Sequence, residues 1–323
     1  MSFASGVVLA RSSALRLVDC TLIKSTMTTE HPNLSEMPRM PEEYELTATL
    51  FRTKYRSQMC VVFPRLLSSW PACQRWAQRS HLEAALGGPQ ASVRVQTSPN
   101  NRVFNAVYHR SADTDVVTVA SMLNATLYAQ NGRVGAVPTG ATQDVARRLY
   151  CKLSLSATLT ADMGALPKGV FGEPKGLGPA VAGETTFWVG SAGVVTPLHF
   201  DHCHTVIAQI VGRKRVIVSP LSDSEHLYPF SVADGAARTS RVDLHAWMAG
   251  DRMQREAFPD VAHARLLQCV IEPGDVVYIP PGWYVRASSG PRVGGRRVTG
   301  GRWRAVRGGR PCDQWCAVVM ATG

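Results

Sequence analysis

The stretch that decides the fold is residues 196–220, which read TPLHFDHCHTVIAQIVGRKRVIVSP. It contains two apolar runs, residues 205–211 and 214–220, joined by the dipeptide Gly212-Arg213. Short runs rich in Val and Ile are typical of β-strands. A Gly-X pair between two such runs predicts a two-residue hairpin, because glycine adopts the positive φ that a tight turn needs.

Alternation of side chains along these strands predicts one face with a distinctive chemistry. Without a bulge, that face carries His199, Asp201, Ile207, Gln209, Val211, Lys214 and Val216. An imidazole and a carboxylate, with a third ligand from elsewhere, form the 2-His-1-carboxylate site of non-haem Fe(II). A buried lysine beside them would pair with an anionic cosubstrate. From spacing alone, a solvated loop with an outward-reaching lysine is the alternative.

Further motifs occur in an order that resembles the JmjC (jumonji C) family, and most closely its cupin-like protein-hydroxylase branch. After TPLHFD and AQIVGRKRVIVSP come LYPF at 227–230 and EPGDVVYIPPGW at 272–283. Upstream, VVFPRLLSSWPACQRW at 61–76 is similar to the branch's first strand and helix, and RRLYCKLSL at 147–155 resembles its tyrosine-bearing strand. The resemblance implies a β-rich α+β fold, a cupin-type double-stranded β-helix (jelly roll) with N-terminal helices.

The resemblance also implies a function and a set of site residues. It implies an Fe(II)- and 2-oxoglutarate-dependent dioxygenase that hydroxylates a protein side chain. His199 and Asp201 would be the metal ligands, and no other catalytic residue is implied. Thr196 and Lys214, with Tyr150, would hold the distal carboxylate of 2-oxoglutarate. Hydroxylation is favoured over demethylation because the sequence contains no chromatin-reader module.

One position departs from the family pattern. The family places its third ligand, a histidine, directly after an aromatic pair, but here the pair at 283–284 is followed by Val285. No histidine occurs after His263, and His202 or His204 would substitute only if a bulge turned one toward the metal. The rival interpretation is a catalytically inactive binding or scaffold protein, or a mis-spliced product that lacks the ligand.

Composition divides the chain into three parts. We expect a disordered leader or linker over 1–45, the JmjC/cupin-like domain over 46–284, and a disordered Arg/Gly-rich tail over 285–323. The tail lies outside the family pattern, so the last barrel strand or strands would be missing. Two origins of the tail stay open: a segment that contacts RNA or partners, or sequence that the mature transcript does not normally encode.

Composition also bounds location and partners. The tail supplies most of the formal net charge of +11, so nucleic-acid binding is not expected of the body and is possible for the tail alone. No apolar run reaches the ~18 residues of a membrane span. Eight cysteines without a CxxC pair favour a reducing compartment, cytoplasmic or nuclear. The Ser-rich start also fits an organellar transit peptide. A protein substrate is expected, and the oligomeric state stays open.

Local patterns predict the remaining elements. Helical spacing predicts helices over 72–86, 113–130, 143–151 and 244–248. Apolar runs and alternation predict strands over 59–63, 91–96, 186–190, 194–200, 265–271 and 276–279.

Overall fold

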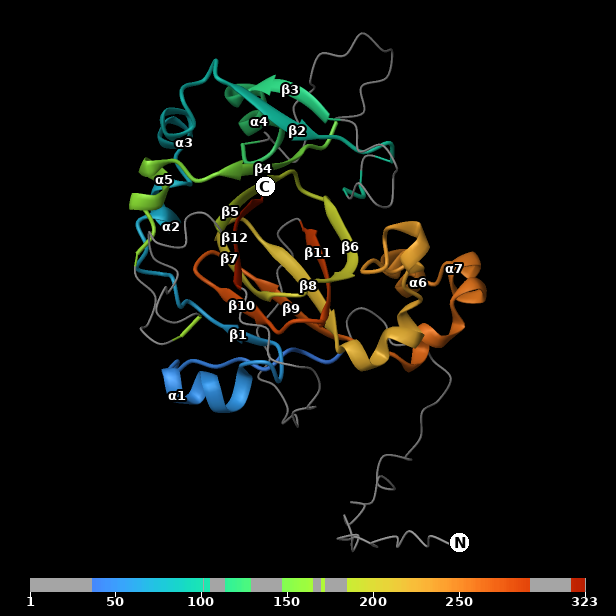
Figure 1. The fold of residues 1–323 in the computed structure, drawn as a ribbon. Coiled ribbons are helices and arrows are strands. Elements are labelled where there is room, and N and C mark those ends of the chain that lie inside the picture. Colours follow the sequence, from blue (N-terminus) through green and yellow to red (C-terminus); the bar gives the residue numbers. More distant parts are fainter. Residues whose placement is uncertain are drawn as a thin grey trace, which may run out of the picture.

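The computed structural model describes residues 37–100, 102–104, 114–128, 147–164, 170–171, 185–290 and 315–322. Its strands form two sheets that pack against each other (Figure 1). In spatial order the first sheet contains β1 (Val61–Phe63), β10 (Val276–Ile279), β7 (His204–Val211), β12 (Trp315–Thr322), β5 (Thr185–Gly190), β4 (Tyr150–Ser154), β2 (Ser92–Gln96) and β3 (Thr114–Thr118). The second contains β6 (Val195–Phe200), β11 (Tyr284–Ser289), β8 (Lys214–Ser219) and β9 (Leu267–Ile271).

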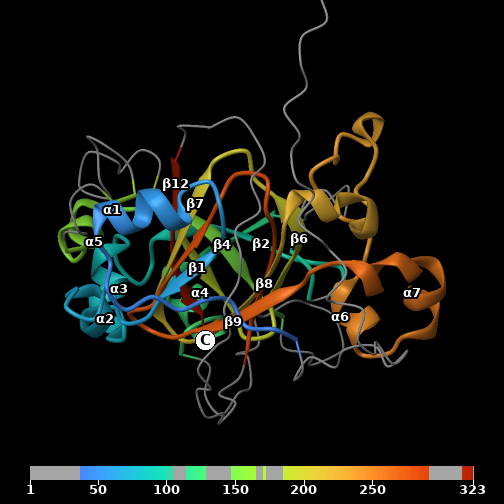
Figure 2. The same ribbon diagram turned by 90° about the horizontal axis from the view of Figure 1, so that it is seen from below.

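Short helices cover the outer faces of both sheets. They are α1 (Ala48–Leu50), α2 (Ala72–Arg75), α3 (Arg79–Ala85), α4 (Val119–Ala125), α5 (Ala157–Ala161), α6 (Leu244–Met248) and α7 (Arg252–Ala257), with a π-helical turn at Phe51–Tyr55 and 3-10 turns at Leu221–Leu227, Val232–Asp234 and Pro259–His263. Helices α1, α2, α3 and α5 lie beyond the eight-stranded sheet, and α6 and α7 lie beyond the four-stranded sheet (Figure 2).

Buried side chains form three layers that match this arrangement. Between the sheets lies the interior cluster, which draws on both: Met40, Cys60, Val62, Ile207, Val216, Val218, Cys269, Ile271, Val277, Ile279, Val285 and Met320. The outer layers pack the eight-stranded sheet against α2–α5 and the four-stranded sheet against α6 and its neighbours. From β5 to β8, and again from β9 to β12, successive strands alternate between the two sheets. This is the β-rich jelly roll that the sequence resemblance predicts.

The predicted hairpin between residues 205–211 and 214–220 is wrong. β7 pairs with β10 and β12, whereas β8 pairs with β11 and β9, so the two strands belong to different sheets. Gly212, with φ of 75°, turns the corner between the sheets. The chain crosses there because both strands bury side chains in the interior, and a flat hairpin would leave the core open. Ile207 and Val216 still share that interior, from opposite sides.

A bulge in β6 changes which of its residues share a face. Val285 of β11 pairs with His199, but Ala287, two residues later, pairs with Thr196, three residues earlier. The extra residue in β6 is a β-bulge, which resets the alternation of side chains. Thr196 and His199 therefore face the same side although they are three residues apart, an outcome that regular alternation excludes.

The end of the chain contains strands that the sequence did not predict. Val285 and the four residues after it belong to β11, and Trp315–Thr322 forms β12 between β5 and β7. The expectations of a disordered tail and of missing last strands are wrong for these residues; 291–314 lie outside the described residues. Among the described strands, β12 alone pairs in parallel within the sheets, because β5 and β7 run in the same direction. Val319 and Met320 fit there because one packs in the outer layer and the other in the interior cluster, so both faces of the strand are covered.

Three local expectations also differ from the structure. Residues 37–45, assigned to the leader, contact the body, since Met37 and Met40 are buried and Met40 N donates to Gln268 O. The helix predicted over 113–130 is β3 followed by α4, because Thr118 caps the helix at Ser121 N. Of the helix predicted over 143–151, the described residues 147–149 are not helical and strand β4 begins at Tyr150; residues 143–146 lie outside the described residues.

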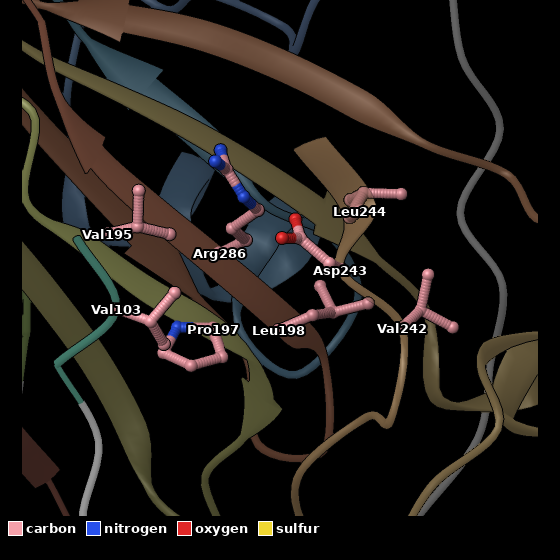
Figure 3. Close-up of a pocket in the computed structure, with 8 residues that line it drawn as sticks. All are labelled: Val103, Val195, Pro197, Leu198, Val242, Asp243, Leu244 and Arg286. Atoms are coloured by element: carbon pink, nitrogen blue, oxygen red, sulfur yellow. The ribbon is translucent and has the colours of Figure 1, made fainter. Parts of the chain in front are cut away.

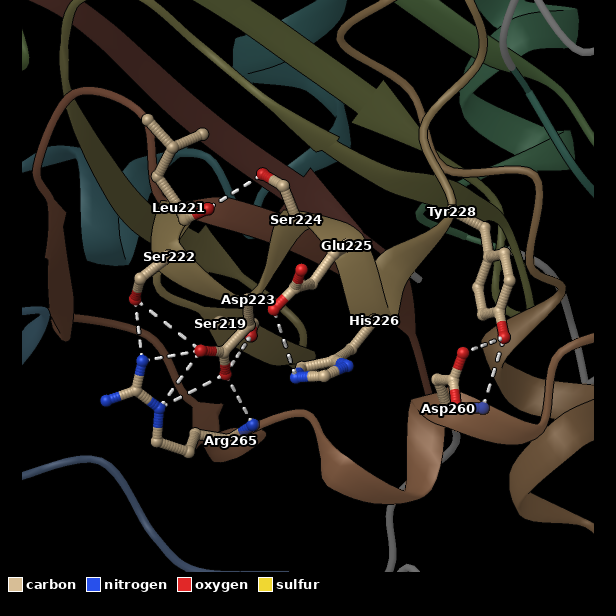
Figure 4. Close-up of polar contacts among 10 residues, drawn as sticks. All are labelled: Ser219, Leu221, Ser222, Asp223, Ser224, Glu225, His226, Tyr228, Asp260 and Arg265. Carbon is tan, nitrogen blue, oxygen red and sulfur yellow. Dashed lines mark hydrogen bonds and ion pairs between the residues drawn. The ribbon is translucent and has the colours of Figure 1, made fainter.

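The insert between β8 and β9 is fixed by one buried carboxylate. Asp223 accepts hydrogen bonds from Arg265 N at 2.6 Å and from Arg265 Nε at 3.0 Å (Figure 4). In the same insert, Tyr228 Oη donates to Asp260 Oδ2 at 2.7 Å. These contacts anchor both ends of the segment that carries α6 and α7 over the four-stranded sheet.

Candidate metal and cosubstrate site

The predicted cosubstrate residues converge from three strands. Tyr150 lies on β4, Thr196 on β6 and Lys214 at the start of β8. Lys214 Nζ lies 5.6 Å from the Tyr150 ring centroid, and the side chains of Tyr150 and Thr196 are hydrogen-bonded. Because these strands belong to both sheets, the three side chains meet only when the jelly roll closes.

Lys214 is a buried cation with a weak partner. It is 1% exposed, and its Nζ donates to Met320 Sδ at 3.3 Å. A thioether is a weak acceptor, and no described carboxylate lies within ion-pair distance of Nζ. Burial lowers the pKa of Lys214 to about 7. Burial also raises the pKa of the Tyr150 hydroxyl, which is hydrogen-bonded to the Thr196 side chain. The arrangement therefore favours an anion that would restore the full charge on Lys214.

His199 has one ring nitrogen held by the main chain. It lies on β6, half-buried, and its Nδ1 is 2.8 Å from Pro197 O. A carbonyl oxygen only accepts hydrogen bonds, so Nδ1 carries the proton and Nε2 keeps its lone pair in the neutral ring. A main-chain carbonyl on one ring nitrogen is a common means of orienting a metal-binding histidine.

Asp201 follows β6 directly and is tied to the turn before β11. Its main-chain oxygen accepts from Gly282 N at 2.8 Å, which joins the end of β6 to the Pro-Pro-Gly turn. Its carboxylate lies 3.7 Å from Arg238 Nη1, and both side chains are more than a third exposed. Such an exposed pair is weak, so the carboxylate stays accessible to another cation.

Val285 lies directly opposite His199. The two residues pair across β6 and β11, so their side chains point to the same face. Val285 is 5% exposed and belongs to the interior cluster. The position that follows the aromatic pair, where the sequence pattern led us to expect a ligand, is therefore adjacent to His199 in space and is filled by an alkyl group that has no lone pair.

Among the described residues, no third donor joins His199 and Asp201 to complete an Fe(II) site. Within the described ranges, no group of three or more His, Cys, Asp or Glu side chains is placed to hold a metal ion. His202 is exposed against Phe200, and His204 Nδ1 lies 2.8 Å from Tyr278 Oη in the outer layer of the eight-stranded sheet. Both point away from the interior, as predicted, so neither replaces the third ligand.

Sequence reasoning missed two contributors to the site. Trp188 of β5 stacks on Tyr150 with ring centroids 4.8 Å apart, and Met320 of β12 contacts Lys214. An aromatic residue in a predicted strand was a usable signal for Trp188. Nothing in the local sequence marked Met320, because its place depends on where β12 inserts.

Comparisons with known proteins agree with this architecture. Residues 47–303 match the family model described as a cupin-like domain. The chain is 36% identical over 104 residues to Jumonji C domain-containing protein 5 of Drosophila melanogaster, covering 32% of this chain and 24% of that protein. It is 38% identical over 102 residues to Lysine-specific demethylase JMJ30 of Arabidopsis thaliana, covering 31% and 22%.

A longer match is to HSPB1-associated protein 1 of Bos taurus, at 27% identity over 238 residues, 70% of this chain and 45% of that protein. The matched parts thus span about a quarter of the first two relatives and under half of the third.

None of the helices in the described part of the chain has the length and apolar character needed to cross a membrane.

Proposed function

Since the chain belongs to the cupin-like domain family, in its JmjC branch, we propose that its site is that of an Fe(II)- and 2-oxoglutarate-dependent dioxygenase acting on a protein side chain. We propose further that Val285 holds this chain short of turnover. The observation that carries the proposal is the convergence of a buried Lys214 with Tyr150 and Thr196 in the same interior that His199 faces. His199 and Asp201 supply two metal ligands and Val285 occupies the place of a third.

The cosubstrate half of the site has a clear physical logic. The distal carboxylate of 2-oxoglutarate would pair with Lys214 Nζ, and the Tyr150 and Thr196 hydroxyls would bond its remaining lone pairs. Charge-assisted hydrogen bonds in a water-excluded site are about twice as strong as neutral ones. Binding would raise the pKa of Lys214 above its present value of about 7, so the pair forms with the lysine fully charged.

The substrate class rests on the relatives and on the sequence. One relative is named a lysine-specific demethylase, which points to protein substrates. We favour hydroxylation over demethylation because 61–76 and 147–155 resemble the hydroxylase branch. A cytoplasmic or nuclear site of action is favoured by the eight cysteines without a CxxC pair.

A second candidate function is favoured by Val285 itself. With two donors, the chain would retain metal poorly, because a site short of a ligand relies on water to complete its shell. The protein would then act as a catalytically inactive binding or scaffold protein that keeps the jelly roll and the cosubstrate pocket. The two candidates differ at a single side chain, which makes them separable.

Succinate release from 2-oxoglutarate, measured with Fe(II), ascorbate and O₂, tests the proposal. We expect no release from the wild type, release from Val285→His, and none from Val285→His combined with His199→Ala. Turnover by the wild type that His199→Ala abolishes would show that a third ligand exists elsewhere. A folded Val285→His variant that binds Fe(II) yet releases no succinate would favour the binding protein over the oxygenase.

A further inference from the structure

Ser289, at the end of β11, has a buried hydroxyl with no hydrogen-bond partner among the described residues. The residue is 3% exposed, and its Oγ is shielded from solvent. Its main chain is held on both sides, since its N donates to Val194 O at 2.9 Å and its O accepts from Gly193 N at 3.0 Å. The backbone therefore fixes the side chain in place while the hydroxyl makes no bond, a state that lowers stability.

Alternation along β11 directs this hydroxyl into the barrel interior. Arg286 points to the outer face of the four-stranded sheet, where it lines a small hollow beside Asp243 (Figure 3). Its Nη1 donates to Ser288 Oγ at 3.3 Å, so Ser288 lies on that outer face too. Val285, which belongs to the interior cluster, and Ser289 occupy the alternate positions. The register of β11 with β8 is continuous over residues 284–289, so no shift there reverses the alternation.

In the interior, Ser289 lies beside the residues that we propose to hold the cosubstrate. Strand β11 lies between β6 and β8 in the four-stranded sheet. Ser289 pairs directly with Lys214 of β8, and residues paired in this way have Cβ atoms about 5 Å apart on one face. Ala287 pairs with Thr196 of β6, so Ser289 is diagonal to Thr196. Ser289 is therefore a neighbour of two of the three proposed cosubstrate residues.

We propose that Ser289 Oγ is a further donor to the distal carboxylate of 2-oxoglutarate, an inference that rests on the function proposed above. A carboxylate has two oxygens and about four acceptor sites, so it can accept from Lys214 Nζ and from a neighbouring hydroxyl at once. One ligand then satisfies both buried groups. The lysine gains a full ionic partner, and the serine gains the acceptor that no described residue provides.

Met320 is the group that the carboxylate would replace at Lys214. Its Sδ lies 3.3 Å from Lys214 Nζ and is a weak acceptor. An unbranched side chain with three rotatable bonds adapts readily to a changed neighbour. The exchange replaces a weak contact of the ammonium group by a charge-assisted hydrogen bond, which favours the ligand over the thioether.

Ser289 should contribute more to affinity than Tyr150 or Thr196. The side chains of Tyr150 and Thr196 are hydrogen-bonded to each other, so each gives up part of an existing interaction when it turns to a ligand. The Ser289 hydroxyl gives up no such bond. Its hydrogen bond to the charged carboxylate is therefore gained in full, which corresponds to about ten- to hundredfold in affinity.

Calorimetric titration of the full chain with 2-oxoglutarate, without metal, tests the proposal. Ser289→Ala should bind about ten- to hundredfold more weakly than the wild type. Ser288→Ala is the matched control, because it removes the neighbouring hydroxyl on the outer face, and it should bind as the wild type does. The probe 2-oxopentanoate, which has a methyl group in place of the distal carboxylate, should bind neither the wild type nor Ser289→Ala.

The stability of the ligand-free protein separates a binding role from a structural one. Ser289→Ala should keep or raise the midpoint of urea unfolding, because it removes a buried oxygen that has no partner. Ser240→Ala should lower the midpoint, because the buried Ser240 Oγ donates to Leu227 O at 2.6 Å and accepts from Val242 N at 3.1 Å. A midpoint that Ser289→Ala lowers as far as Ser240→Ala does would mean that the hydroxyl has a partner within the fold, and would overturn the proposal.

Two binding results would also overturn it, and they differ in what else they remove. If Ser289→Ala binds 2-oxoglutarate as tightly as the wild type while Lys214→Met loses binding, Ser289 is excluded from a cosubstrate site that otherwise stands. If the folded wild type does not bind 2-oxoglutarate at all, the cosubstrate site itself is wrong, and the role of Ser289 falls with it.

Discussion

The two ends of the barrel interior differ in completeness. At one end, the side chains of Lys214, Tyr150 and Thr196, which we propose to hold the cosubstrate, lie close together. At the other end, His199 faces Val285 across β6 and β11, and among the described residues no third metal-binding side chain joins His199 and Asp201. Strands β8 and β11 run between the two ends. Lys214 of β8 pairs with Ser289 of β11 at one end, and Val218 of β8 pairs with Val285 of β11 at the other. On the proposed function, one half of the site keeps its residues while a single side chain, Val285, disables the other.

The physical reason is that the two halves contribute differently to stability. A valine in the interior cluster adds apolar burial of about 1.5–3 kcal/mol, so replacing a ligand by Val285 does not weaken the fold. Lys214 does the opposite, because a buried ammonium with a thioether partner lowers stability. Its presence in the core is better explained by ligand binding than by folding.

The largest change should come from completing the metal end. We expect Val285→His to convert weak Fe(II) binding into stoichiometric retention after dialysis, because a third donor opposite His199 completes the facial set. Iron content by elemental analysis measures it, and Val285→Leu is the size-matched control without a lone pair. Tight retention by the wild type would contradict the comparison between the two ends.

The next largest change should come from removing the cation at the other end. Lys214→Met should weaken 2-oxoglutarate binding by ~2–5 kcal/mol, because truncating one partner leaves the other charge buried and unpaired. Calorimetric titration without metal measures it. Equal affinity of the wild type and the variant would show that Lys214 does not anchor the cosubstrate.

Stability should respond to pH through the same lysine. The folded pKa of Lys214, about 7, lies below the ordinary lysine value of 10.5, so between these values the unfolded chain binds more protons and stability rises with pH. From pH 7 to 8.5 the wild type should gain about 1.5 kcal/mol relative to Lys214→Met. Urea unfolding of both proteins at each pH isolates the lysine from the cysteines and tyrosines, which the two share. A constant difference would mean that the lysine is solvated.

The smallest change should come from Tyr150→Phe. Removing the hydroxyl deletes the hydrogen bond with Thr196 and one donor to the cosubstrate, so affinity should fall about two- to tenfold, as for a neutral hydrogen bond. Thr196→Val is the matched control from the other partner. If the double variant loses no more than either single variant, the two hydroxyls act as one unit.

The sequence by itself determined much of the molecule. The apolar runs placed β5 to β10 within a few residues, and 244–248 matches α6. The motif order identified the family, and it predicts the five site residues, which stay a prediction. The absence of the expected histidine at Val285 was visible in the sequence, because the Pro-Pro-Gly turn and the aromatic pair fix the position at which the family pattern places that ligand. These features are local, so a linear pattern records them.

Other features were decided only by tertiary structure. The corner at Gly212 looks like a hairpin in the sequence, because a hairpin and a crossover between sheets can use the same turn residue. The two differ only in pairing: here β7 pairs with β10 and β8 pairs with β11, not with each other. The bulge that turns Thr196 toward the face of His199 depends on the register with β11. Strand β12 forms because β5 and β7 leave a place between them that pairs both of its edges, and this alone brings Met320 to Lys214. Contacts between segments that are distant in the chain produce no periodic pattern in the sequence. They are therefore visible only in the folded structure.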